Sequence, residues 1–166
     1  MKKTIVFLAL VALTALNACS DQTAETAALK SRVDALEKQL ADTYKPGFGE
    51  FMSGIQAHHA KLWFAGLNRN WKLADFEVHE IMETLDDLQK YQSERKETEL
   101  LPSLNPALEN VNAAVQKQDL AAFQSGYELL TEACNNCHRN VHYEFNQVQT
   151  PDQPPFGNQV FAPPAQ

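Results

Sequence analysis

Cysteine is scarce in this chain, with three residues among 166, at positions 19, 134 and 137. A structural zinc site takes about four cysteine or histidine ligands, usually from two paired motifs. The chain has the pair Cys134 and Cys137 and no second pair anywhere. The sequence therefore argues against a closed zinc site.

Positive charge is also in short supply. Fourteen lysines and arginines stand against 21 aspartates and glutamates, which gives a formal net charge of −7. A surface with this excess of negative charge repels polyanions. We therefore expect neither nucleic acid nor anionic lipid headgroups among the partners.

The chain lacks an apolar run that would cross a bilayer comfortably. The run from Ile5 to Leu16 is short and follows Lys2 and Lys3 at the N-terminus. This layout is typical of a secretory signal, so we assign residues 1–18 to targeting. Their removal takes away two lysines and no acid, which changes the formal charge from −7 to −9.

The signal ends in Leu16-Asn17-Ala18-Cys19, which resembles the lipobox of bacterial lipoproteins. The resemblance implies cleavage before Cys19 and lipid modification of that cysteine. The alternative is ordinary signal cleavage that leaves a free cysteine near the new terminus. Because Ser20 rather than an aspartate follows, the resemblance favours the outer membrane. We expect a periplasm-facing protein that is held to the membrane by lipid.

Residues 24–43 carry apolar side chains at spacings of four, three and four: Leu29, Val33, Leu36 and Leu40. This is a heptad seam. It lasts under three heptads, so an isolated coiled coil would be marginal. The seam can pair weakly between molecules, pack on the rest of the protein, or form a helical stalk. We favour a coiled-coil-like stalk over residues 19–46.

Four further segments have the apolar spacing of helices, which predicts an all-α domain over residues 47–146. The first two span about 47–66 and 71–92. A shorter third helix is expected to have Asn105 as its cap and Pro106 at its first position. The fourth begins after Asp119 as cap, and its pattern continues to Phe145 with the cysteine pair on the buried face.

The tail, residues 147–166, holds five of the eight prolines and has no periodicity. It is expected to be extended or disordered, without docking of Phe156 or Phe161.

The sequence "TEACNNCHRN" at 131–140 admits three cysteine chemistries: half a zinc site, a thiol redox pair, or a covalent haem anchor. A thioredoxin-like pair needs a strand-to-helix turn, whereas this pair lies within a long helical pattern. Two thiols one helical turn apart can reach the two vinyl groups of a porphyrin, and the next residue then offers an imidazole to iron. Together with an export signal, the motif favours covalent haem c on Cys134, Cys137 and His138.

Four antiparallel helices with this motif near the end of the last one resemble the cytochrome c′ and cytochrome c-556 family. The resemblance covers residues 47–146 and implies an antiparallel four-helix bundle. It makes Cys134 and Cys137 thioether anchors and His138 the proximal iron ligand. The family's usual arginine four positions after that histidine is replaced by His142, and the first helix lacks the common arginine ahead of its methionine.

In that family the other haem face looks toward the first helix, which here offers Met52, His58 and His59. Met52 and His59 are about 10.5 Å apart along a helix axis, so at most one lies over the iron. Met52 matches the axial methionine of cytochrome c-556. An open sixth position, ligation by histidine, and Met52 as core filler are the alternatives. The acids around His79, namely Glu77, Glu80 and Glu83, are expected on a mostly solvated face.

Two function classes follow. With two strong ligands the iron can only transfer electrons to and from a redox partner protein, whereas an open position admits nitric oxide or carbon monoxide. No acid-base or nucleophile constellation stands beside the haem motif, so we expect no enzyme. Weak self-association through the stalk or the bundle is a further expectation.

Overall fold

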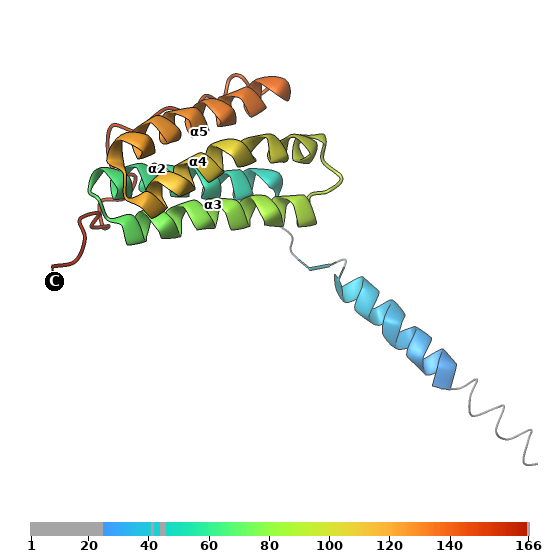
Figure 1. Cartoon of the computed structure of the whole chain (residues 1–166). Helices are drawn as coiled ribbons and strands as arrows, with labels where there is room; N and C mark the ends of the chain where they lie inside the picture. The colour runs from blue at the N-terminus through green and yellow to red at the C-terminus, as the bar shows by residue number, and fades with distance from the viewer. Residues whose placement is uncertain (1–24, 41, 44–45, 166) are drawn as a thin grey trace, which may run out of the picture. The chain divides into compact units, whose positions relative to one another are not determined.

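The computed structural model describes residues 25–40, 42–43 and 46–165. Within these ranges the chain is all-helical and contains no strand (Figure 1). The described residues from Pro46 onward form one compact unit, and those before it belong to a separate unit. None of the described helices is both long and apolar enough to cross a membrane. The predicted signal segment 1–18 and Cys19 lie outside the described residues.

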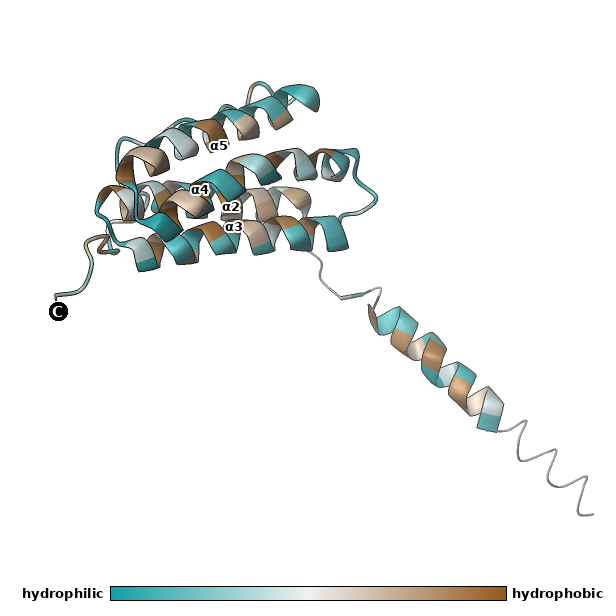
Figure 2. Ribbon diagram, in the orientation of Figure 1, coloured by the Kyte–Doolittle hydropathy of each residue, from teal (hydrophilic) through white to brown (hydrophobic). Residues whose placement is uncertain are grey.

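In the described part of the separate unit, residues 25–40 form a helix that lies inside the predicted seam. Its apolar positions are exposed and alternate with hydrophilic ones along the helix (Figure 2). The helical conformation agrees with the heptad spacing, while its use as a stalk stays a prediction.

The compact unit begins with two long helices that confirm the predicted segments. Helix α2 spans Phe48–Leu67 and helix α3 spans Trp71–Tyr91. The side chain of Asn70 accepts a hydrogen bond from the backbone N–H of Leu73 and caps α3. The two helices pack on each other along their lengths (Figure 1).

The charged stretch after α3 is a 3₁₀-helix, η1, Lys96–Leu104, which leads directly into α4, Asn105–Lys117. The expectation that Asn105 caps this helix is wrong. Leu104 occupies the cap position with nearly helical dihedrals and no side-chain hydrogen bond, because η1 continues into α4 without an extended residue. Pro106 does lie at the start of α4, where its missing N–H costs nothing.

Helix α5 spans Leu120–Asn140. Asp119 caps it as predicted, with its carboxylate accepting from the N–H groups of Ala121 and Ala122. The helix ends five residues before Phe145, contrary to the apolar pattern. The chain turns at His142, whose φ is +62°, and Phe145 is 82% exposed. The apolar spacing beyond Asn140 therefore reflects no buried face.

Residues 147–165 contain no helix or strand, but the expectation that neither tail aromatic docks is wrong for Phe161. Phe161 is buried with its ring 5.6 Å from that of Phe64, and its carbonyl accepts from the Asn70 side chain. Phe156 is exposed. Proline keeps the tail extended, and an extended chain can place an isolated aromatic ring on the bundle without any periodicity.

The core of the compact unit lies between α2, α3, α4 and α5, where each helix turns an apolar stripe inward. Its largest fully buried side chains come from all four helices and from η1: Tyr127, Phe123, Leu62, Ile81, Leu88, Leu101, Leu108 and Leu130. Gly66 of α2 lies directly against the Phe123 ring of α5, so α2 and α5 approach closely at this point.

Candidate functional site

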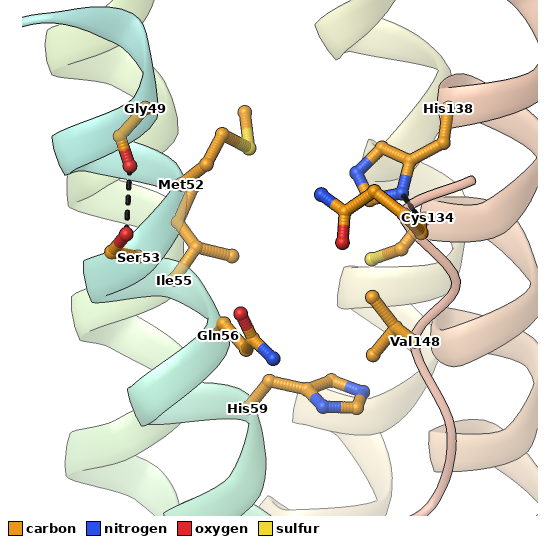
Figure 3. A pocket seen from close by; sticks show the side chains of 10 residues that line it. Gly49, Met52, Ser53, Ile55, Gln56, His59, Cys134, His138 and Val148 are labelled. Atoms are coloured by element: carbon orange, nitrogen blue, oxygen red, sulfur yellow. Dashed lines mark hydrogen bonds between the residues drawn. The ribbon is translucent and has the colours of Figure 1, made fainter. Parts of the chain in front are cut away.

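A hollow of about 160 Å³, open to solvent, lies between α2, α5 and the segment 146–148. We call it the α2–α5 hollow (Figure 3). Its lining combines residues of the Cys-x-x-Cys-His motif with one face of α2: Gly49, Met52, Ser53, Ile55, Gln56, His59, Cys134, His138, Asn146 and Val148.

The segment that follows α5 forms a hydrogen bond with the His138 ring. Its Nδ1 lies 2.6 Å from the backbone carbonyl oxygen of Asn146. A carbonyl oxygen only accepts hydrogen bonds, so Nδ1 carries the proton and donates. In the neutral ring the lone pair is then on Nε2, which is the arrangement of a metal-ligating histidine with a carbonyl partner.

The carbonyl of Asn146 is positioned by a residue inside the motif. Asn135 is 6% exposed and makes two hydrogen bonds to Val148: its amide nitrogen donates to the Val148 carbonyl, and its oxygen accepts from the Val148 N–H, both at 2.8 Å. This pairing holds the segment 146–148 along α5. The sequence alone did not point to Asn135 or Asn146, because nothing in the motif or the tail indicates that residues 146–148 pair with α5.

Cys134 and Cys137 are free thiols one helical turn apart on α5. Cys134 lines the hollow, while Cys137 is buried beside it. Burial raises the pKa of Cys134 to about 12 and also raises that of Cys137. Both thiols are therefore protonated at neutral pH, which is the opposite of the low-pKa thiolate that a thiol redox pair requires.

Met52 and His138 lie on opposite sides of the hollow, Met52 on α2 and His138 on α5 (Figure 3). Met52 is partly buried and packs against the core. The structure thus brings together Met52, Cys134 and His138 from segments more than 80 residues apart in the sequence.

His59 also lines the hollow, but both of its nitrogens are engaged. Nε2 lies 2.9 Å from Oγ1 of Thr131, whose own hydroxyl donates to the Tyr127 carbonyl, so Nε2 carries the proton. Nδ1 then faces the Tyr127 hydroxyl at 2.9 Å. Burial lowers the pKa of His59 to about 4 and raises that of Tyr127, so the ring is neutral and the phenol protonated. Both ring nitrogens of His59 are thus used for contacts within the core.

His58 is turned toward α3. Its Nδ1 lies 2.7 Å from a carboxylate oxygen of Glu77, and the Lys61 ammonium lies 2.5 Å from the other oxygen. The expectation that Glu77 lies on a solvated face is wrong, since the residue is fully buried. The Lys61 ammonium supplies the charge opposite the buried carboxylate, and sequence periodicity does not reveal this pairing.

Three residues of the hollow offer groups that can bind a metal: the His138 imidazole, the Met52 thioether and the Cys134 thiol. The second thiol, Cys137, lies one helical turn from Cys134 on α5. Within the described ranges, no three His, Cys, Asp or Glu side chains gather to hold an ion. His142 lies outside the hollow, exposed in the turn after α5.

Comparisons of this chain with protein-family models, with curated proteins and with solved structures found no match.

Proposed function

We propose that this protein is a c-type cytochrome that carries one covalent haem c and transfers electrons. Cys134 and Cys137 form the thioethers, His138 is the proximal iron ligand and Met52 the sixth ligand. One observation carries the proposal. The Nδ1 of His138 is bound to a carbonyl, which leaves Nε2 for iron in a hollow that Met52 and Cys134 also line.

A haem bound here would supply a reversible one-electron couple. The residues of the chain have separate tasks. Asn146 fixes the His138 ring and increases its basicity through the hydrogen bond to Nδ1. The apolar side chains of Ile55, on α2, and Val148, on the segment after α5, line the hollow from opposite sides and would restrict water there (Figure 3). Met52 offers a soft thioether that favours the reduced metal.

The proposal includes an antiparallel four-helix bundle preceded by a helical stalk, similar to the cytochrome c′ and cytochrome c-556 family. Short connections support the antiparallel order: three residues separate α2 from α3, and two separate α4 from α5. Connections of this length join neighbouring helices of opposite direction. Residues 25–40 would provide the stalk.

The open side of the hollow supports a second candidate function. If Met52 leaves the iron, a small gas such as nitric oxide or carbon monoxide can bind there, and the protein would be a gas binder or scavenger. Absorption spectra of the oxidised, reduced and carbon monoxide-treated protein separate the two. A low-spin spectrum that does not change when carbon monoxide is added supports electron transfer. A high-spin spectrum that shifts when carbon monoxide is added supports gas binding and contradicts Met52 ligation.

The proposed location is the periplasmic side of a membrane, with the outer membrane favoured and Cys19 as the lipid-modified residue. The basis is the lipobox-like sequence, which lies outside the described residues. The redox partner would be another protein, of unassigned identity. Cys19→Ser should move the protein from the membrane fraction to the soluble or unprocessed pool, and unchanged fractionation would count against the anchor.

A further inference from the structure

The helix at residues 25–40 presents its apolar stripe to solvent. The four large side chains of the stripe are half exposed or more: Leu29 55%, Val33 50%, Leu36 61% and Leu40 65%. A single helix of this length is marginal in water on its own. Covering the stripe would remove this apolar surface from water and stabilise the helix.

The order of the apolar residues favours a two-stranded coiled coil. In heptad notation Leu29 and Leu36 occupy d positions, and Val33 and Leu40 occupy a positions. Val33, a β-branched residue at a, with Leu29 and Leu36 at d is the combination that favours two parallel strands, and Leu40 at the other a position adds apolar surface. The stripe therefore matches a second helix with the same pattern, which a second copy of this chain provides.

The charged residues beside the stripe can form attractive pairs between two copies of the helix. The g positions are Glu25, Arg32 and the uncharged Gln39, and the e positions are Lys30 and Glu37. In a parallel pair in register, each g residue faces the e residue five positions later on the other helix. Glu25 then faces Lys30 of the second copy, and Arg32 faces Glu37. Both pairs are of opposite charge, and the two-fold axis makes each of them twice.

The antiparallel arrangement uses these charges less well. When all four apolar residues are paired, e faces e and g faces g. Lys30 then lies opposite Glu37 of the second copy, but Arg32 lies opposite the neutral Gln39. The parallel arrangement gives two kinds of attractive pair where the antiparallel one gives a single kind.

From these observations we infer that two copies of the protein associate through residues 25–40 as a parallel, two-stranded coiled coil. The seam is short, so the association is weak and reversible. A parallel pair brings both N-termini to the same end, which suits two chains anchored in one membrane. The inference rests on the helix at 25–40 and does not depend on the proposed haem.

The test is sedimentation equilibrium of the full purified chain over a range of concentrations, with three charge variants. Arg32→Glu turns two attractive pairs into repulsive ones and should raise the dimer dissociation constant roughly tenfold. Adding Glu37→Arg to this variant restores opposite charges in the parallel pair and should restore wild-type association. Lys38→Glu makes the same change in charge at an f position, away from the seam, and should leave association unchanged.

Other outcomes overturn the inference. A wild-type chain that is monomeric at every concentration excludes pairing, and a trimer excludes two strands. If Arg32→Glu is harmless, or if the double variant associates more weakly than Arg32→Glu alone, the helices are not parallel. Equal weakening by Lys38→Glu and Arg32→Glu would mean that net charge, rather than the e and g positions, controls association.

Discussion

The backbone carbonyl of Asn146 lies 2.6 Å from Nδ1 of His138, so the chain that leaves α5 returns to hold the imidazole at the end of that helix. Asn135, one turn earlier on α5, secures the return by pairing with Val148 through two hydrogen bonds. A residue between the two cysteines thus positions the histidine ring through the segment 146–148.

Asn135→Ala should loosen the segment 146–148. The variant loses two hydrogen bonds of a buried side chain, which should cost about 1 to 3 kcal/mol in urea unfolding. The Val148 N–H should exchange faster with deuterium, because its acceptor is gone. With haem bound, weaker donation from Nδ1 of His138 makes the imidazole less basic, so the reduction potential should rise.

Asn136→Ala is the matched control for this variant. Asn136 is exposed and its amide oxygen contacts Arg139 rather than the tail. Its loss should change stability by less than about 0.5 kcal/mol. Equal exchange of the Val148 amide in both variants would show that Asn135 does not hold the segment.

Met52→Ala tests the sixth ligand. Loss of the thioether should lower the reduction potential, move the spectrum from low toward high spin, and allow carbon monoxide to bind. Met82→Ala is the control, because Met82 is a partly buried methionine that packs on the core from α3 and does not line the hollow. It should reduce stability and leave the spectrum as it was. A low-spin spectrum that survives Met52→Ala would rule out ligation by Met52.

Gly66→Ala and Gly54→Ala, both on α2, should have opposite effects on stability. A Cβ at position 66 would overlap the buried Phe123 ring, whereas a Cβ at position 54 meets no atom within 4 Å. We expect Gly66→Ala to destabilise by at least about 1 to 3 kcal/mol through overpacking. Gly54→Ala should stabilise by about 0.5 to 1 kcal/mol, since alanine favours a helix. Chemical unfolding of both variants decides whether α2 and α5 meet at Gly66.

His59 should make folding sensitive to acid. Its pKa is 6.5 when unfolded and about 4 when folded, so the unfolded state takes up a proton first as the pH falls. Stability from this residue is complete above pH 6.5 and is lost between pH 6.5 and about 4, by about 3 kcal/mol at most. His59→Gln should be less stable at neutral pH but flatter across this window. If the unfolding free energies of the wild type and of His59→Gln changed equally with pH, His59 would not be a buried neutral histidine.

Periodicity predicted the helices well where one face is buried along the whole element. The steps of three and four through Val78, Ile81 and Leu85 located α3 within one residue. The same rule failed at the end of α5, where apolar residues continue past Asn140 but the backbone turns at His142. Spacing reports which residues could share a face, and cannot tell whether a partner covers that face.

The candidate site was predictable in part. Cys134, Cys137 and His138 follow from a local motif, and Met52 from the resemblance to cytochrome c-556. Asn146 could not be found this way, because an extended chain that meets a helix through backbone groups has no side-chain pattern. The prediction that Glu77 lies on a solvated face was wrong for a related reason. Its burial depends on contacts with Lys61 and His58 of another helix.

The most direct test of the central claim is the mass of the intact chain after denaturation and acidic organic extraction, measured on protein produced where haem is attached to exported proteins. The account predicts that haem stays on the polypeptide, because thioether bonds survive unfolding. Haem should be lost when Cys134 and Cys137 are both replaced by alanine, and it should be retained in Cys19→Ser. A wild-type chain whose haem extracts freely, or that never carries haem, would contradict the account.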